Sequence, residues 1–245
     1  WQEARMHERS NAVMRQPAGA ADRALRTPRA AAVAGIVFAV LFALSIGLMR
    51  LAIPEGIAGP GGTAWLQNGG GGVSLALTLV PFAGIAFLWF VGVIRNRLGR
   101  MEDQFFSTVF YGSGLLFLAM MFCSAAIAGG LLSGYQLDPE AMSQSGVLTF
   151  ARTVIYTVTN VYAIRMAGVF MISLATIWVR TGVMPRVFVI ITYVLAVVLL
   201  VAINLSLWVI MVFPAWVFAI SLYILIESMR GKGAAADAAL GSANE

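Results

Sequence analysis

Long apolar stretches recur along nearly the whole chain, and short polar or glycine-rich segments separate them. A transmembrane helix needs about 20 predominantly apolar residues. On this criterion the pattern predicts an all-α fold, namely a polytopic transmembrane helical bundle of six spans. The spans are predicted at residues 30–49, 73–94, 105–132, 160–179, 187–202 and 207–226.

Two of the apolar stretches are too long for a single crossing. Residues 147–179 would form a helix of about 50 Å, whereas the hydrocarbon core is about 30 Å thick. The first part of this helix must therefore stand outside the membrane, bend onto its surface or be buried by partners. Residues 187–226 would reach about 60 Å, so they must fold into a hairpin at their only polar break, around Asn204. We expect Pro81 to kink the second span and Pro214 the last.

The segments outside the spans divide the chain into three parts. Residues 1–29 are polar and arginine-rich, which predicts a mobile cytoplasmic tail, and residues 229–245 are rich in Gly, Ala, Ser and Asn, which predicts a disordered cytoplasmic tail. The six-helix transmembrane domain occupies residues 30–228. Within it, the glycine-rich residues 50–72 predict an exposed loop. Its four successive glycines at 69–72 lack the Lys and Ser/Thr of a phosphate-binding loop.

Basic residues are distributed unequally between the two sides of the predicted bundle. Thirteen of the sixteen Lys and Arg fall on the side of the termini, while Arg50 and Arg152 fall on the other side and Arg165 lies within a span. The positive-inside rule then predicts that both termini are cytoplasmic. The expected location is a plasma membrane, the inner membrane in a bacterium. A five-span chain would move Arg230 and Lys232 outside, so the charge pattern favours six spans.

Composition narrows the possible chemistry. The chain has 60% hydrophobic and 11% charged residues, which excludes a water-soluble globule. His7 and Cys123 are the only residues of their types, so no histidine or cysteine pair can ligate haem, copper or zinc, and no intrachain disulfide can form. Lys232, the single lysine, lies beyond the last span, which excludes a retinal Schiff base in the bundle. None of the eleven acidic residues lies in the middle of an apolar stretch. We therefore expect no carboxylate proton relay, no cofactor and no metal.

The basic side also indicates the expected partners. A net charge of +5 predicts affinity for the anionic lipids of the inner leaflet, and no nucleic-acid-binding motif accompanies the basicity. Small residues in the third span, Ala125, Ala128 and Gly129, predict close packing against another helix. The expected partners are therefore membrane lipids and other membrane subunits or further copies of the chain, and not nucleic acid.

Aromatic residues are expected to form belts at the two membrane–water interfaces. The inner belt would contain Trp89, Phe90, Trp178 and Tyr223, and the outer belt Trp65, Tyr135 and Trp208.

The outer half of the fourth span carries an unusual density of polar side chains. The candidate site for an anion or a lipid head group consists of Arg152, Tyr156, Asn160, Tyr162 and Arg165. These residues cover more than half of the helix circumference, so they cannot all face lipid. One interpretation is a cavity open to the outside in which the two arginines hold a phosphate or carboxylate.

The alternative interpretation of this segment is structural, and we favour it. Arg165 would then snorkel outward or pair with Asp138, Glu140 or Glu55, because intramembrane arginines normally have a protein partner.

The segment Arg180-Thr181-Gly182-Val183-Met184-Pro185-Arg186 joins two apolar spans through a short basic loop. It resembles a loop of uncharacterised bacterial six-span membrane proteins, over the last third of the chain. The resemblance implies the span count and no activity.

These observations favour a non-enzymatic integral membrane protein, an accessory or scaffolding subunit of a membrane assembly. The alternative is a passive channel or carrier for an anionic or lipid-like solute that uses residues 152–165. A lipid-modifying enzyme is disfavoured, because the sequence offers no convincing set of acid, base and nucleophile. No catalytic residue is predicted.

Overall fold

The structure, a computed structural model, describes residues 18–52, 70–98, 104–144, 146–201 and 207–241. These residues are helical almost throughout and contain no strand. The helices are α2 (Ala18–Ala52), α4 (Gly70–Leu98), α5 (Gln104–Leu137), α6 (Pro139–Gln144), α7 (Val147–Tyr156), η1 (Thr157–Ala163), α8 (Ile164–Thr181), α9 (Arg186–Val201), η2 (Leu207–Met211) and α10 (Val212–Gly241). The all-α prediction is confirmed.

Five helical segments are long and apolar enough to cross a membrane: Arg29–Met49, Gly71–Arg95, Phe105–Leu137, Val147–Thr181 and Val209–Arg230. The sixth apolar helix, α9, has 16 residues and a length of about 24 Å. It corresponds to the predicted fifth span but is shorter than the five others. The chain is therefore a multi-pass helical protein of the membrane type.

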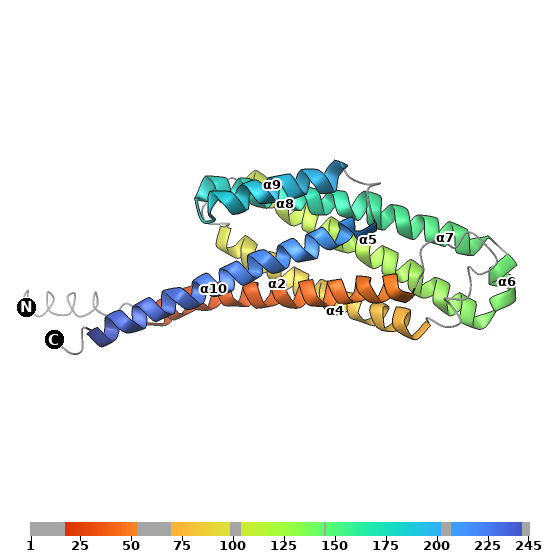
Figure 1. Cartoon of the computed structure of the whole chain (residues 1–245), viewed down its shortest axis with the longest axis horizontal. Helices are drawn as coiled ribbons and strands as arrows, with labels where there is room; N and C mark the ends of the chain where they lie inside the picture. Colours follow the sequence, from red (N-terminus) through yellow and green to blue (C-terminus); the bar gives the residue numbers. More distant parts are fainter. Residues whose placement is uncertain (1–17, 53–69, 99–103, 145, 202–206, 242–245) are drawn as a thin grey trace, which may run out of the picture.

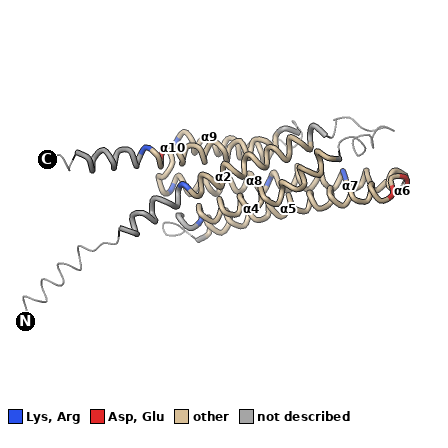
Figure 2. The backbone as a smooth tube through the Cα atoms, turned by 90° about the horizontal axis from the view of Figure 1, so that it is seen from below, with Lys and Arg blue, Asp and Glu red and all other residues tan. Residues whose placement is uncertain are grey.

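Successive long helices run in opposite directions along one axis (Figure 1). The start of α2, the end of α4, the α8–α9 turn and the far part of α10 gather at one end, which we call the cationic end. Five arginines of the described helices belong to it: Arg29, Arg95, Arg180, Arg186 and Arg230. Asp138 and Glu140, on or beside α6, lie at the opposite end (Figure 2). The described charges are thus largely segregated to the two ends of an apolar bundle.

The predicted fourth span is one continuous helical rod formed by α7, η1 and α8. Its 35 residues span about 52 Å, well beyond a hydrocarbon thickness of about 30 Å. With α5 and the short α6, its first part forms a hairpin that projects at the end opposite the cationic end (Figure 1). The segment beyond one membrane thickness is therefore packed against α5 and does not bend away.

Aromatic rings from four long helices and α10 fill the centre of the bundle. Phe87 of α4 is the hub: its ring centroid lies 4.7 Å from that of Phe38 and 5.5 Å from those of Phe117 and Phe170. Phe213 of α10 lies 5.9 Å from Phe87. All of these rings are buried. Such contacts hold the helices together by van der Waals packing, the main attraction available between helices in lipid.

Close helix approaches occur at glycines to which the sequence analysis gave no packing role. A Cβ on Gly35 of α2 would meet Ser221 Oγ of α10 and would lie 2.8 Å from Phe90 Cδ2. A Cβ on Gly168 of α8 would lie 3.2 Å from the Ala196 backbone oxygen of α9. Around Gly129, where close packing was predicted, a Cβ would meet only Leu77 at an ordinary 3.8 Å.

Three helix ends differ from the bounds expected from hydropathy. Helix α2 begins at Ala18, and α10 continues to Gly241, so parts of both predicted tails are helical. Both segments are rich in alanine, the best helix former, and they extend helices that already exist. Gly70–Gly72 belong to α4 and not to a loop.

The two prolines that were expected to kink their spans lie in different settings. Pro214 lies in the first turn of α10, directly after the 3₁₀ segment η2, where a missing N–H costs little. The helix type therefore changes beside this proline. Helix α4 continues through Pro81. Asn204, the predicted turn, lies outside the described residues, but α9 ends and η2 begins on either side of it.

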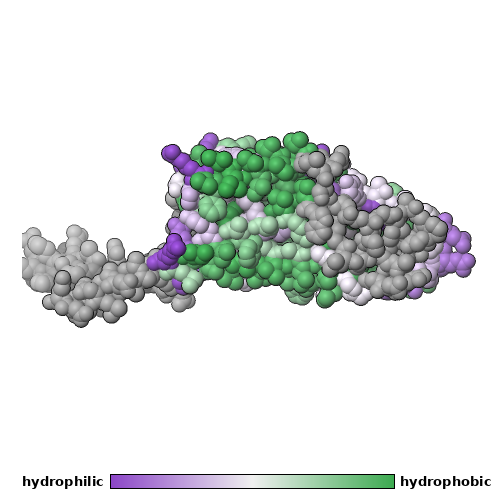
Figure 3. Space-filling model, in the orientation of Figure 1, coloured by the Kyte–Doolittle hydropathy of each residue, from purple (hydrophilic) through white to green (hydrophobic). Residues whose placement is uncertain are grey.

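The predicted aromatic belts are partly wrong. Trp89 is 69% exposed, as a belt residue should be, whereas Phe90, Trp178 and Tyr135 are buried. The space-filling view shows strongly hydrophobic surface on two lobes with a paler band between them (Figure 3). Sequence position alone could not tell whether an aromatic ring near a span end faces lipid or the neighbouring helix.

Candidate functional site

The five predicted site residues lie on the rod formed by α7, η1 and α8. Arg152 and Tyr156 belong to α7, Asn160 and Tyr162 to η1, and Arg165 to the first turn of α8. The polar cluster seen in the sequence therefore coincides with a change of helix type. Segment η1 is a π-helix, and π segments inside α-helices are rare and frequently lie at functional sites.

The π segment shifts the backbone hydrogen bonds by one residue. The N–H of Ile164, which follows η1, donates to the carbonyl of Thr159, five positions back. In an α-helix the acceptor would be four positions back. A change between the two patterns leaves one carbonyl without its usual partner, and in an apolar environment such a group needs another donor.

Two of the five site residues donate to backbone carbonyls of this region. Asn160 Nδ2 lies 3.1 Å from the Tyr156 oxygen, and Arg165 Nη1 lies 3.3 Å from the Val161 oxygen. Both bonds reach four residues back, in the direction in which helical side chains lean. The Arg165 guanidinium thus extends toward α7 and away from the cationic end, as a snorkelling arginine would.

A third polar group of the segment connects it to α5. Thr159 Oγ1 and Ser124 Oγ lie 2.7 Å apart, and Ser124 is buried. Ser124 opens the small-residue run whose packing role was predicted. Its hydroxyl, rather than a glycine contact, links the two helices at this level.

The five site residues do not converge on one point. Arg152 and Arg165 are 13 positions apart on a continuous rod, which separates their backbones by about 20 Å. Tyr156 and Tyr162 are both exposed, whereas Asn160 is buried. Within this set, the Asn160 amide donates to the Tyr156 backbone carbonyl. A single small anion held by both arginines is not the arrangement seen.

The structure also bears on the carboxylate partners expected for Arg165. Among the residues that the structure describes, Arg165 makes its one hydrogen bond to Val161 and no ion pair. Asp138 is used locally, because its Oδ1 accepts a bond from the Ala141 N–H at the start of α6. Glu55 lies outside the described residues.

Sequence reasoning missed a second set of polar contacts, between α8, α9 and α10. Trp216 Nε1 donates to Thr192 Oγ1 at 2.9 Å inside the core. Thr176 Oγ1 lies 2.8 Å from the Tyr193 hydroxyl. The threonines were the available signal, because a Thr in an otherwise apolar span often bonds across helices.

Two arginines at the cationic end lie over aromatic rings of α5. The Arg95 guanidinium carbon is 4.5 Å from the centroid of the Tyr111 ring, and that of Arg180 is 4.5 Å from the centroid of the Phe106 ring. These cation–π contacts fix the ends of α4 and α8 against the start of α5. Both arginines were predicted only as topology signals.

The described part of the chain holds no group of three His, Cys, Asp or Glu residues that could bind a metal. Cys123 is exposed on the surface of α5. Comparison of the chain with protein-family models, with curated proteins and with solved structures finds no match.

Proposed function

We propose that this protein is a non-catalytic accessory or scaffolding subunit of a membrane assembly. The observation that carries the proposal is the hairpin of α5, α6 and α7. It projects beyond one membrane thickness and presents apolar side chains there: Leu137 is 87% exposed and Phe150 is 72% exposed. Exposed apolar residues outside the hydrocarbon layer are typical of a surface that another protein covers.

The proposal includes the membrane topology. The chain crosses the bilayer six times, with α9 as a short fifth span and both termini in the cytoplasm of a bacterial cell. Support comes from the alternating helix directions (Figure 1) and from the arginines gathered at one end (Figure 2), which the positive-inside rule assigns to the cytoplasm. The bond from Arg29 Nε to Ser228 Oγ, 3.2 Å long, ties the first and last spans at that end.

If the hydrocarbon layer begins at Arg180, its thickness of about 30 Å corresponds to the length of helix from Arg180 to about Asn160. The segment η1 then lies at the outer boundary of the hydrocarbon layer. Phe150 lies about 15 Å farther out, at or beyond the head groups. The exposed Phe150 ring could therefore be covered by a protein partner.

The alternative function is a passive channel or carrier for an anionic or lipid-like solute. Two exposed tyrosines favour it, Tyr156 at the end of α7 and Tyr162 in the π segment, since they leave polar groups at the outer boundary. The centre of the bundle favours the scaffold, because Phe87, Phe117 and Phe213 occupy the axis along which a solute would pass. A route through one copy would have to separate these rings.

The test of the scaffold proposal uses the full chain purified in mild detergent from its native membrane. We expect a partner subunit or a second copy at fixed stoichiometry in native mass spectrometry. The double substitution Leu137→Ser with Phe150→Ser should release it without lowering the melting temperature. Gln136→Ser is the matched control, since Gln136 is exposed on the same hairpin but polar. A chain that is monomeric and unaccompanied in the membrane, or solute flux in liposomes, would overturn the proposal.

Topology is tested separately by cysteine labelling in a Cys123→Ser background. Val183→Cys, in the exposed α8–α9 turn, should react only from the cytoplasm, and Ser143→Cys, on α6, only from outside. Labelling of both from one side would contradict the alternation of the spans.

A further inference from the structure

The five arginines of the cationic end differ in the contacts that their guanidinium groups make. Arg29 bonds to Ser228, and Arg95 and Arg180 lie over rings of α5. Arg186 and Arg230 are exposed, and within the described part of the chain neither has a hydrogen bond or an ion pair. These two guanidinium groups are therefore free to bind an external anion.

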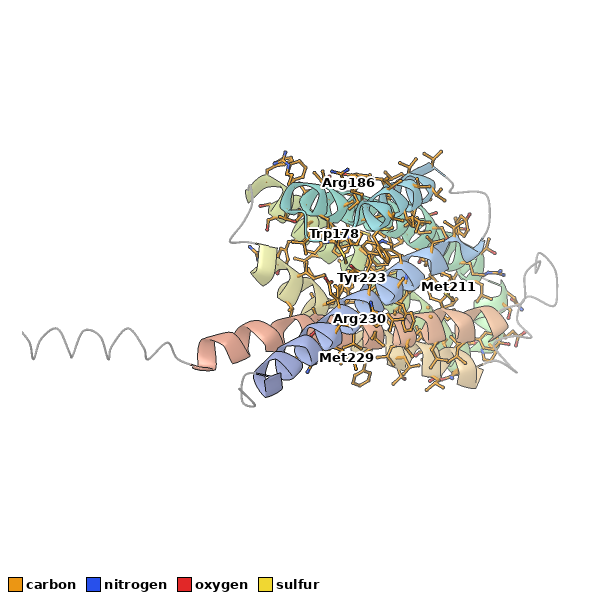
Figure 4. All side chains as sticks on the ribbon, turned by 60° about the vertical axis from the view of Figure 1, so that its left-hand side comes forward. Trp178, Arg186, Met211, Tyr223, Met229 and Arg230 are labelled. Carbon is orange, nitrogen blue, oxygen red and sulfur yellow. The ribbon has the colours of Figure 1, made fainter. Side chains whose placement is uncertain are left out.

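The two free arginines flank one aromatic contact between α9 and α10. Phe188 and Tyr223 have ring centroids 4.7 Å apart. Arg186 precedes Phe188 by two residues, and Arg230 follows Tyr223 by seven, which is two helical turns on the same face. In the view toward the cationic end, Tyr223 and Trp178 lie between Arg186 and Arg230 (Figure 4). Arg186, the first residue of α9, and Arg230, on the Tyr223 face of α10, thus lie on either side of the seam that these rings form between the two helices.

Apolar side chains continue the surface next to each arginine. Val187 is 65% exposed and Met229 59% exposed, and Ile226 is exposed one turn farther along α10. Helices α9 and α10 share few backbone contacts, and the Phe188–Tyr223 ring pair and the Trp216–Thr192 hydrogen bond join them through side chains. A cationic rim beside an apolar seam matches an amphiphile whose head is anionic and whose chains are apolar.

We propose that an anionic glycerophospholipid binds this seam, with its phosphate between Arg186 and Arg230 and an acyl chain along Phe188 and Tyr223. A basic site between membrane helices at the cytoplasmic surface is a common form of lipid head-group recognition. A lipid fits better than a soluble phosphate, because the apolar side chains beside the arginines have no role with an inorganic ion. This inference rests on the proposed function only for the topology, which puts the cationic end at the cytoplasmic leaflet. It does not depend on a protein partner at the hairpin.

The test measures lipid preference in the full chain. Native mass spectrometry of the protein, titrated with phosphatidylglycerol and with phosphatidylcholine in detergent, gives a binding ratio for the two lipids. We expect the wild-type chain to prefer phosphatidylglycerol. Arg186→Gln or Arg230→Gln should lower this preference about fivefold each, and the double variant about 25-fold.

Two matched controls separate this site from general attraction to a basic surface. Arg95→Gln removes an arginine of the same end that is already over Tyr111, and it should leave the preference within about twofold. Glu227→Gln removes a negative charge one turn from Arg230 and should raise the preference. The melting temperature of every variant reports whether the bundle remains folded.

An equal loss in Arg95→Gln and in the double variant would overturn the proposal, as would a wild-type chain without lipid preference. Inorganic phosphate that displaced phosphatidylglycerol at equal concentration would show an anion site and not a lipid site. The hairpin variant Leu137→Ser with Phe150→Ser should keep the lipid preference. Loss of the partner and loss of the lipid are thus separate outcomes.

Discussion

The two halves of the rod formed by α7, η1 and α8 differ in polarity. The half nearest the cationic end, α8, is apolar and buried: Phe170, Leu174 and Ile177 are inaccessible to solvent. The other half, from α7 through η1 into the first turn of α8, carries polar side chains, of which Asn160 and Arg165 donate to the carbonyls of their own helix. The apolar half packs against the other helices of the bundle. In the polar half, several side chains instead donate hydrogen bonds to backbone carbonyls of their own helix. A conspicuous polar cluster in a membrane helix therefore need not be a binding site.

The largest effect should come from the ring cluster of the bundle centre, against which Phe170 of the apolar half packs. Phe87→Ala removes a ring that contacts five others, those of Phe38, Phe90, Phe117, Phe170 and Phe213. We expect the free energy of unfolding to fall by about 3–5 kcal/mol, the range for a buried Phe→Ala change. Reversible unfolding in mixed detergent micelles measures it. Phe82→Ala, at a ring of the same helix that is 57% exposed, should change it by less than about 0.5 kcal/mol. Equal losses at the two positions would show that the ring cluster does not hold the bundle.

Helix crossing at Gly35 should give the next largest effect. Gly35→Ala forces a methyl group against Phe90 and Ser221, and overpacking of this kind costs about 1–3 kcal/mol. Gly92→Ala on α4 meets no atom within 4 Å and should stabilise the helix by about 0.5–1 kcal/mol. The same unfolding measurement compares the two. A neutral Gly35→Ala would mean that α2 and α10 lie farther apart in the membrane.

The polar link of the other half should contribute less. Ser124 and Thr159 join α5 to η1 through their hydroxyl groups. A double-mutant cycle with Ser124→Ala and Thr159→Val isolates this bond, and we expect a coupling of about 0.6 kcal/mol, the average for hydrogen bonds between membrane helices. A coupling energy larger than the loss of unfolding free energy in Phe87→Ala would show that the polar link contributes more to stability than the aromatic core.

Sequence reasoning was strongest where hydropathy alone decides the outcome. All six predicted apolar spans are present as helices, including those on either side of Asn204, because backbone groups in lipid must bond within their own segment. The aromatic core was not predictable from the sequence. Phe87 and Phe82 are both phenylalanines of α4, and only the direction in which each ring points makes the first buried and the second exposed. The helix crossing at Gly35 depends on a partner 186 positions later in the chain, Ser221.

The candidate site was predictable as a segment but not as a geometry. The density of polar residues identified the region that becomes η1. No sequence signal indicated the π register, and the separation of Arg152 from Arg165 became certain only because α7, η1 and α8 form one continuous rod. The bonds from Asn160 and Arg165 to backbone carbonyls four residues back likewise appear only in the three-dimensional structure.

The smallest effect, and the one that best separates structure from binding, concerns Arg165. Arg165→Ala removes a 3.3 Å bond to the Val161 carbonyl, a contact at the long end of hydrogen-bond geometry. It also relieves the cost of holding a charge near the hydrocarbon boundary. Because these terms offset, we expect the free energy of unfolding to fall by about 0.5 kcal/mol. Arg165→Lys should recover most of this loss, because a lysine can donate to the same carbonyl. Neither variant should change the complement of co-purifying anions or lipids in native mass spectrometry. A fully stable Arg165→Ala chain that had lost a bound anion or its liposome flux would assign the polar half to ligand binding and place transport ahead of scaffolding.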